Sequence, residues 1–239
     1  MKFLIVNDDS IHAPGIALLA RAAASLGEVT VVAPEYQCSA MSQRITIEKP
    51  MVLRQYAENA WSLEGTPADC VKAALLHILK EKPDFVLSGV NAGWNAGFDI
   101  QHSGTLGAAF EALMCGVPAI AFSNAHGAAW DLPERHLQEL IRELTALPVP
   151  EGAVWNVNFP DCPPERCRGI LRNRYAAAAP LFREWFVVEA ADGVTTLTLN
   201  GEIQGPGSPT PAGSDLEALM DGYISVGTVD CTVMKHTYK

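Results

Sequence analysis

The chain has 239 residues, of which 49% are hydrophobic and 18% are charged, a composition typical of a folded domain and not of a disordered chain. Lys and Arg number 17 and Asp and Glu number 27, so the formal net charge is −10. Such an acidic surface argues against binding to nucleic acid polymers or anionic membranes, although a bound metal ion could admit a small anionic substrate by reversing the local charge.

Two further features of the sequence indicate the cellular location of the protein. The apolar run in MKFLIVNDDS is too short for a signal peptide, and no apolar stretch of the sequence is long enough to span a membrane. The six cysteines include no CxxC pair, and no His cluster accompanies the closest two, Cys162 and Cys167. We therefore expect a cytoplasmic protein with reduced thiols.

The first 33 residues predict a strand–helix–strand unit. Residues 2–6 (KFLIV) are almost wholly apolar, as in a central strand that is buried on both faces of a parallel sheet. An Ala/Leu-rich helix is expected after Pro14 and Gly15 and ends at Gly27, and residues 28–33 (EVTVVA) predict a second strand. A crossover of this size favours a right-handed connection between parallel strands.

Residues 34–65 interrupt this alternation. A polar loop with Ser39, Ser42 and Thr46 comes first, and the stretches RITIEK and MVLRQY then predict an extended hairpin. Hydroxyl side chains on a loop are usually solvated turn residues. This loop would therefore bear on function only if it folded over a site formed elsewhere.

The alternation of helices and strands resumes at Thr66. Thr66 is a good N-cap, Pro67 suits the first helical position and Asp69 complements the helix N-terminus. The pattern then predicts a continuation of this helix to about residue 80, a strand at 84–88, a helix at 104–115, a strand at 118–123, a helix that Asp131 caps and that begins at Pro133, and a strand at 154–159. This order indicates an α/β fold with a mainly parallel sheet.

After Pro160 the chain changes character. It becomes rich in Pro and Gly, contains alternating segments such as FVVEA and TTLTLN, and offers one short helix at about 215–220. Because no linker is evident, we expect a single domain over residues 1–239, with its core at about 1–160 and a β-rich extension at about 161–239. The extension would decorate the core or reach a partner subunit as an exchanged arm.

Asp8 and Asp9 directly follow the first expected strand. Sites in open parallel sheets form at the carboxyl ends of strands, and adjacent carboxylates are hard oxygen ligands suited to Mg²⁺, Mn²⁺ or Ca²⁺. The alternative is an Asx turn that caps the next helix. The two interpretations are about equally supported by these residues alone, although repulsion between neighbouring carboxylates favours a cation nearby.

A second candidate segment is the loop at residues 89–97 (GVNAGWNAG), which alternates Asn and Gly after a buried strand. Glycines permit close approach of the backbone, and the amides of Asn91 and Asn95 could bind a metal ion or donate to phosphate. A turn-rich surface loop is the alternative, but the position at the carboxyl end of a strand favours function.

A third candidate is the segment Ser103, Gly104 and Thr105, which opens a helix. Backbone N–H groups at a helix N-terminus form a cradle for anions, whereas the alternative is ordinary N-capping by Ser103. The segment is not a G-x-x-x-x-G-K-[ST] loop, and the sequence has neither a G-x-G-x-x-G after the first strand nor a G-x-S-x-G elbow. It would therefore hold a phosphoryl group without being a P-loop.

Many of these segments match one family in order and spacing, namely NDDS-IHAPGI, VVAP…S-A-M-S…IT, GTPADCV, D-FVLSGVNAGWNAGFDI, HSGTLGAAFEA, G-VPAIAFS, NVNFP and S-D followed by GYISV. Through them the chain resembles the SurE-like nucleotidases, the survival protein E family. The resemblance covers nearly the whole chain and is densest over residues 1–123. Several motifs in the same order are far more specific than any one of them.

The resemblance implies a Rossmann-like three-layer α/β core with a mainly parallel sheet, and a β-rich C-terminal extension used to form a homodimer or homotetramer. It implies a phosphatase that acts on nucleoside 5′- and 3′-monophosphates, and in some members on short polyphosphate. It also implies one divalent metal ion per subunit, Mg²⁺ or Mn²⁺ among others.

The motif match also assigns residues to these roles. Metal ligands fall on Asp8, Asp9, Ser39 and Asn91, and phosphate-contacting positions fall on Asn95, Ser103, Gly104 and Thr105. Asp8 or Asp9 would in addition orient or deprotonate the attacking water, and the sequence leaves both open.

Three positions depart from the family pattern. The family usually has Gly at the positions of Ser10 and Ala40, so both place a Cβ where the backbone could need a positive φ. It usually has Tyr at the position of His102, which could tune specificity or the response to pH near the phosphate. Two other functions stay open: a non-catalytic nucleotide-binding module, in which Ser10 and Ala40 would mark lost activity, and a phosphatase for sugar phosphates or polyphosphate.

Overall fold

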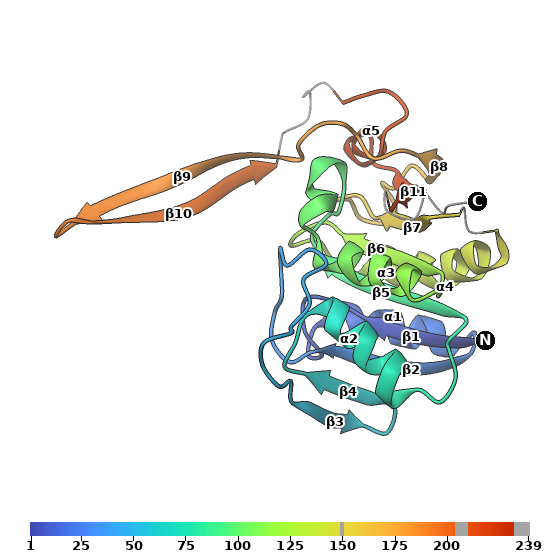
Figure 1. Ribbon diagram of the computed structural model, residues 1–239. Helices are drawn as coiled ribbons and strands as arrows, with labels where there is room; N and C mark the ends of the chain where they lie inside the picture. The colour runs from blue at the N-terminus through green and yellow to red at the C-terminus, as the bar shows by residue number, and fades with distance from the viewer. Residues whose placement is uncertain (149–150, 204–209, 232–239) are drawn as a thin grey trace, which may run out of the picture.

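The computed structural model describes residues 1–148, 151–203 and 210–231. Within these ranges the main sheet has nine strands in the order β3-β4-β2-β1-β5-β6-β7-β11-β8, and β9 and β10 form a separate hairpin (Figure 1). None of the helices in the same ranges is long and apolar enough to cross a membrane. The elements in chain order are β1 (Lys2–Val6), α1 (Pro14–Ala24), β2 (Glu28–Pro34), β3 (Leu53–Ala57), β4 (Ala60–Leu63), α2 (Pro67–Ala73), the π-helical turn η1 (Ala74–Ile78), β5 (Phe85–Ala92), the 3₁₀ segment η2 (Gly97–His102), α3 (Gly104–Met114), β6 (Ala119–Asn124), α4 (Asp131–Ala146), β7 (Ala153–Asn158), β8 (Ile170–Arg174), β9 (Phe182–Ala191), β10 (Val194–Ile203), α5 (Asp215–Met220) and β11 (Ile224–Asp230).

Parallel pairing dominates the main sheet, which confirms the expected α/β fold. β1 pairs in parallel with both β2 and β5, β5 pairs with β6, and β6 pairs with β7. Antiparallel pairs join β3 to β4 and β7 to β11. The chain moves to one side of β1 for β2 and to the other side for β5. The strand order therefore reverses beside β1, and α/β proteins bind ligands at such a reversal.

Helices cover both faces of the sheet and give the molecule three layers. α1 and α4 pack on one face, where Leu19 and Ile141 share a buried cluster, and α2 and α3 pack on the other around Val71. In β1, Leu4 and Ile5 are both 0% exposed and belong to opposite clusters. A strand buried on both faces needs apolar residues at every buried position, which explains why residues 3–6 form a continuous apolar run after the exposed Lys2.

The predicted hairpin within residues 34–65 exists, but the prediction of a strand at RITIEK (residues 44–49) is wrong. The paired strands are β3 and β4, and residues 44–49 form no strand. The amide of Thr46 donates to Asp69 Oδ1 at 2.9 Å, beside the N-terminus of α2. This stretch is therefore held by a helix cap and not by a neighbouring strand.

The helix termini confirm one prediction and correct two. Thr66 caps α2 as expected, because its hydroxyl accepts from the amide of Asp69 at 3.2 Å while the Asp69 carboxylate accepts from the amide of Thr66 at 2.9 Å. The α-helical part ends at Ala73 and continues as η1, earlier than expected. Asp131 does not cap α4: the N-cap is Trp130, and Asp131 lies in the first turn, where its charge is favourable.

The region after residue 160 contributes both to the main sheet and to a projecting arm. β11 pairs with β7 and with β8, so both later strands extend the main sheet. β9 and β10 pair over ten positions and project away from the core (Figure 1). Residues 204–209 and 232–239 of the expected extension lie outside the described residues. The single domain over 1–239, divided at about residue 160, stays a prediction.

Gly15, near the start of α1, allows this helix to lie directly against the end of β5. A Cβ on Gly15 would lie 2.0 Å from the carbonyl oxygen of Val90 and 3.1 Å from the Trp130 ring. Such a close approach leaves no room for a side chain. Because Val90 directly precedes Asn91, the contact also fixes the backbone that leads into the Asn/Gly loop.

Replacing Gly15 by Ala tests this contact, because the sign of the change in the free energy of unfolding depends on it. Helix propensity alone would stabilise the protein by up to about 1 kcal/mol, whereas a clash with Val90 should destabilise it by about 1–3 kcal/mol. Urea unfolding measures the difference. Gly201→Ala is the control, since its Cβ would meet no atom closer than 3.5 Å. A stabilised Gly15→Ala protein would contradict the described packing.

Candidate active site

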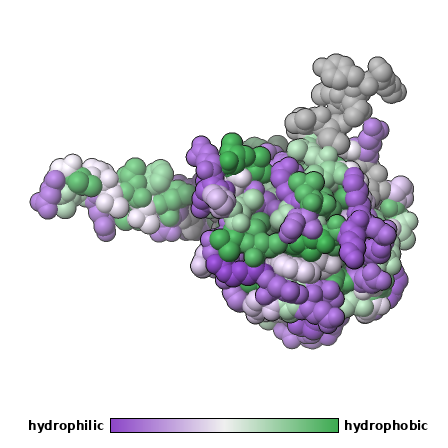
Figure 2. All heavy atoms as spheres, turned by 60° about the horizontal axis from the view of Figure 1, so that its bottom comes forward, coloured by the Kyte–Doolittle hydropathy of each residue, from purple (hydrophilic) through white to green (hydrophobic). Residues whose placement is uncertain are grey.

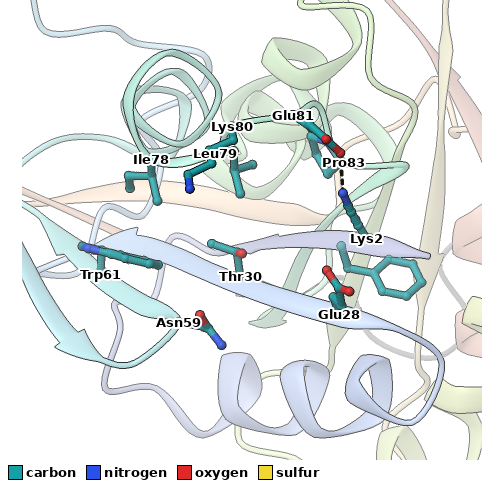
Figure 3. Close-up of a pocket in the computed structure, with 11 residues that line it drawn as sticks. Lys2, Glu28, Thr30, Asn59, Trp61, Ile78, Leu79, Lys80, Glu81 and Pro83 are labelled. Carbon is teal, nitrogen blue, oxygen red and sulfur yellow. Dashed lines mark hydrogen bonds and ion pairs between the residues drawn. The ribbon is translucent and has the colours of Figure 1, made fainter.

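Two of the larger cavities lie at opposite ends of the parallel strands. One, of ≈ 360 Å³, lies at the amino ends of β1, β2 and β4 between Lys2, Trp61 and the segment after η1 (Figure 3). There Lys2 is already paired with Glu81, and the charged groups that line the cavity are of both signs. The other, of ≈ 330 Å³, lies at the carboxyl ends. Its carboxylate and amide side chains identify it as the candidate site.

The carboxyl-end cavity gathers the predicted site residues from distant parts of the chain. Asp8 and Asp9 follow β1, Ser39 follows β2 and Asn91 lies at the end of β5. Six of the eight predicted residues line the cavity: Asp8, Asp9, Ser39, Asn91, Asn95 and Ser103. The other two, Gly104 and Thr105, directly follow Ser103 and contact Asp8.

Asp8 is a buried carboxylate that is held in place by the start of α3. Its side chain is 3% exposed, and its Oδ1 accepts from the Thr105 hydroxyl at 2.7 Å. Burial raises the pKa of Asp8 from 3.8 to about 6; the Thr105 hydrogen bond opposes the rise, and the charge of Asp9 adds to it. The protein thus holds this carboxylate in a fixed orientation at a cost in desolvation.

Asp9 lies nearer the solvent and is oriented by the Asn/Gly loop. Its Oδ2 accepts from the amide of Ala92 at 2.9 Å. Burial raises the pKa of Asp9, while the Ala92 hydrogen bond and the charge of His126 oppose the rise. His126 Nδ1 lies 3.1 Å from the carbonyl oxygen of the same residue, Ala92, so Asp9 and His126 both contact the backbone of Ala92.

The turn after β1 confirms that the departures from the family pattern fall on unusual backbone. Ser10 has φ 95° and Ala40 has φ 57°, both in the region that favours glycine. Asn7 stabilises the first of these turns, since its side-chain amide donates to the carbonyl oxygen of Ser10 at 2.8 Å. Both turns therefore form with a Cβ present, at a cost of roughly 1–2 kcal/mol each.

The loop after β2 folds over the site, which was the condition for its hydroxyls to matter. The amide of Cys38 donates to the carbonyl oxygen of Asp8 at 2.7 Å, and the amide of Ser42 donates to that of His102 at 3.0 Å. Ser39 is exposed and accepts from the Gln37 side chain at 3.1 Å. The loop is thereby tied to both walls of the cavity.

The two asparagines of the loop after β5 are held differently. Asn91 donates from Nδ2 to the carbonyl oxygen of Gly93 at 2.8 Å, which leaves its Oδ1 to accept from or bind another group. Asn95 is 5% exposed, and its Nδ2 donates to Ser123 Oγ at 2.8 Å. Its backbone is fixed by Asn158, whose Oδ1 accepts from the Asn95 amide at 2.9 Å.

The N-terminus of α3 lies against Asp8. Ser103 is the N-cap, with its Oγ accepting from the Leu106 amide at 3.1 Å. The amides of Gly104 and Thr105 have no acceptor within the helix, as in the first turn of any α-helix. A Cβ on Gly104 would lie 2.9 Å from the Cβ of Asp8, so glycine permits this approach. The Thr105 hydroxyl is directed to Asp8, and only its backbone amide is left for a phosphate.

The donor set fits a hard divalent cation. It offers two carboxylates, the Asn91 amide oxygen and the Ser39 hydroxyl, which are oxygen ligands of the kind that Mg²⁺ and Mn²⁺ prefer. The part of the chain that the structure describes contains no group of three or more His, Cys, Asp or Glu side chains that could hold a metal. The two statements agree, because this set has only two carboxylates and is completed by neutral oxygens.

The cavity also has walls that the sequence did not indicate. Gln37, Asp99, His126 and Phe182 line it beside the predicted residues. His126 has the sequence context of a surface residue, and it is indeed exposed. Asp99 belongs to η2 and lies within the quoted motif that ends in GFDI, but the sequence indicated no role for it. Phe182 belongs to β9, and no motif marks it. Only the tertiary arrangement of the arm brings Phe182 to the cavity.

The chain is similar to known proteins in both sequence and structure. The family model described as survival protein SurE matches residues 3–179. A protein named 5′-nucleotidase SurE from Methylocella silvestris is 39% identical over 236 residues, covering 95% of this chain and 92% of the relative. Another of that name from Brucella canis is 37% identical over 244 residues, covering 99% and 94%. The crystal structure of the SurE protein from Aquifex aeolicus gives a TM-score of 0.84 at 33% identity over 98% of this chain and 97% of that chain.

The raised pKa of Asp8 predicts how stability depends on pH in the metal-free protein. The folded chain binds the Asp8 proton more tightly than the unfolded chain does, so the contribution of Asp8 to stability falls as pH rises from about 4 through 6. A shift of about two units corresponds to about 3 kcal/mol. Asp8→Asn keeps the oxygen that accepts from Thr105 and removes the charge. In EDTA it should match the wild type near pH 4 and exceed its stability by up to about 3 kcal/mol above pH 6.

Urea unfolding across this pH range measures the effect, with the exposed Asp192→Asn as the control. In saturating Mn²⁺ the wild type should instead be more stable than Asp8→Asn, because only the wild type would be stabilised by the ion. A difference between wild type and Asp8→Asn that does not change with pH would contradict the desolvation of Asp8.

Proposed function

Because this chain belongs to the survival protein SurE family, we propose that it is a 5′-nucleotidase that hydrolyses nucleoside monophosphates to nucleoside and phosphate with one divalent metal ion per subunit. The charge of the cavity carries the proposal: Asp8, Asp9 and Asp99 line it, and no lysine or arginine does so among the described residues. A phosphate dianion would be repelled there unless a cation offset the carboxylates.

The residues that would hold the metal ion are Asp8, Asp9, Ser39 and Asn91, with Mg²⁺ or Mn²⁺ as the first candidates and other divalent cations as alternatives. When bound, such an ion polarises the phosphoryl group and lowers the pKa of the attacking water. Thr105 and Ala92 fix the two carboxylates through hydrogen bonds of 2.7 Å and 2.9 Å, so the ligands are oriented before the ion binds.

The phosphoryl group would be held at the start of α3. The amides of Gly104 and Thr105 point out of the helix N-terminus, where an anion is favoured. Ser103 uses its oxygen to accept from Leu106, which leaves its hydroxyl proton to donate to a phosphate oxygen. The Asn95 side chain has a second N–H besides the one that donates to Ser123. These donors would stabilise the charge that develops on the equatorial oxygens.

Asp9 is the better placed carboxylate to orient the attacking water. Asp8 is 3% exposed and uses Oδ1 for the Thr105 hydroxyl, whereas Asp9 lies nearer the solvent and uses only Oδ2, for Ala92. The Oδ1 of Asp9, which the Ala92 hydrogen bond leaves available, would accept a hydrogen bond from the attacking water and so orient it. None of these groups contacts the oxygen that links the phosphate to the rest of the substrate. We therefore propose nucleoside 3′-monophosphates and short polyphosphate as further substrates.

An assay of phosphate release tests the proposed function. The panel holds nucleoside 5′- and 3′-monophosphates, ribose 5-phosphate and short polyphosphate, each with Mg²⁺, with Mn²⁺ and with EDTA. We expect metal-dependent release, fastest from nucleoside monophosphates. Asp8→Asn should lower kcat by at least about 100-fold, the scale seen when a group that stabilises transition-state charge is removed.

Near-normal activity of Asp8→Asn at saturating metal would overturn the assignment of Asp8. Release from no member of the panel would favour a non-catalytic nucleotide-binding module, and preference for ribose 5-phosphate or polyphosphate would favour a phosphatase of another substrate class.

A cytoplasmic location is proposed together with this function. All six cysteines lie within the described ranges and are free thiols, as is usual in a reducing compartment. Nucleoside monophosphates are the proposed partners, without a nucleic acid polymer or a membrane. The acidic composition, with a formal net charge of −10, supports this choice.

The arm formed by β9 and β10 supports a homodimer or homotetramer. Its apolar side chains, among them Trp185, Phe186, Leu197 and Leu199, are between 39% and 57% exposed. Figure 2 shows apolar residues along the projecting arm. An isolated two-stranded hairpin is marginally stable in water, and exposed apolar surface of this kind usually marks an interaction site. A second copy of the chain would cover the arm.

Light scattering of the full chain and of a variant whose residues 184–201 are replaced by a short Gly/Ser linker tests this assembly. The full chain should have the mass of a dimer or tetramer, and the variant should have a smaller mass. Equal masses for both proteins would show that the arm does not hold the subunits together.

A further inference from the structure

The arm does more than project from the core, because its first residue forms part of the cavity wall. Phe182 opens β9, is half-buried and lines the cavity that contains Asp8 and Asp9. Among the described residues that line this cavity, it alone comes from the region after β7. The rest of β9 and the whole of β10 are exposed.

Two hydrogen bonds donated by backbone amides attach the root of the arm to η2. The amide of Leu181 donates to Asp99 Oδ2 at 2.9 Å, and the amide of Phe98 donates to the carbonyl oxygen of Ala179 at 2.9 Å. Figure 1 shows the arm leaving the core beside this segment. Gly97 makes the approach possible: it has φ 58°, and a Cβ there would lie 2.4 Å from the Ala179 carbonyl oxygen.

Asp215 adds a second attachment. Its two carboxylate oxygens accept from the amide of Gly97 at 3.0 Å and from the amide of Ala177 at 2.9 Å. Leu181 is 1% exposed within a small cluster with Leu216, against which Phe182 also packs. Phe182 therefore has its position fixed by the core.

The cavity thus has two kinds of wall. Asp8, Asp9 and the start of α3 offer charge and hydrogen bonds, as a phosphoryl group requires. Phe182 offers a partly exposed aromatic ring. Trp94 also lines the cavity, but it lies inside the Asn/Gly loop and its indole N–H donates to the Phe159 carbonyl oxygen. Substituting Trp94 would disturb Asn91 and Asn95, which lie in the same loop. Phe182 lies far from both in sequence, so it can be substituted without changing that loop.

We propose that Phe182 stacks on the nucleobase of the substrate, so that the root of the arm gives the site its preference for nucleotides over phosphate esters without a base. This inference rests on the proposed function and identifies the residue that recognises its substrate class. Every nucleobase has a π-face, so a single aromatic ring accepts all of them. The expected selectivity is broad, with purines ahead of pyrimidines because they overlap the ring over a larger area.

Steady-state kinetics with AMP and ribose 5-phosphate test the proposal, because the two substrates share the phosphate and the sugar and differ in the base. In the full-length chain, Phe182→Ala should raise KM for AMP by about 10- to 100-fold. It should leave kcat/KM for ribose 5-phosphate within about twofold, which also shows that the variant is folded. Phe182→Trp should retain a KM for AMP close to that of the wild type.

Phe98→Ala is the matched control, since Phe98 is an exposed aromatic residue at the same root that does not line the cavity. Phe98→Ala should leave KM and kcat/KM unchanged for both AMP and ribose 5-phosphate. The inference would be overturned if Phe182→Ala lowered kcat/KM equally for AMP and ribose 5-phosphate, or if it left KM for AMP unchanged.

Equilibrium binding of AMP, measured by calorimetry on the same proteins, separates this inference from the proposed function. A wild type that releases no phosphate from either substrate, yet binds AMP in a manner that depends on Phe182, would leave the inference standing and remove the nucleotidase. A wild type that does not bind AMP would overturn the inference.

Discussion

The fold of this protein buries two adjacent carboxylates, Asp8 and Asp9, at the carboxyl end of its central strand. β1 is buried on both faces and delivers Asp8 and Asp9 to a cavity that no lysine or arginine lines among the described residues. Burial raises the pKa of both side chains. A folded chain that keeps two such groups together gains from a cation between them, and the same cation would admit a phosphate into an acidic cavity.

The backbone around Asp8 is packed closely enough to maintain this arrangement. Gly104 brings the start of α3 against Asp8, and a Cβ on Gly107 would lie 2.1 Å from the carbonyl oxygen of Ser42, in the loop that covers the site. Ser10 and Ala40 adopt positive φ although each carries a Cβ. Both turns thus adopt positive φ at positions where the family pattern would place glycine, and in the first of them the Asn7 side-chain amide donates to the carbonyl oxygen of Ser10 at 2.8 Å.

Local chemistry in the sequence predicts much of this structure, and tertiary contacts account for the rest. The apolar run of β1, the Thr66 cap and the position of polar residues after buried strands are local signals, and they led to the α/β fold and to a cavity lined by six of the eight predicted residues. RITIEK alternates like a strand but pairs with no neighbour, because a helix cap holds it. Phe182 has no local signal: Asp99 and Asp215 place it at the cavity through contacts across 82 and 118 positions of the chain.

Anomalous diffraction from crystals of the full chain grown with MnCl₂ would show whether Asp8 and Asp9 bind a divalent metal ion. We expect one Mn²⁺ peak per chain, in direct contact with carboxylate oxygens of both Asp8 and Asp9 and close to Asn91. Crystals in which Mn²⁺ binds only elsewhere, or in which Asp8 and Asp9 have no ion at saturating concentration, would contradict this expectation.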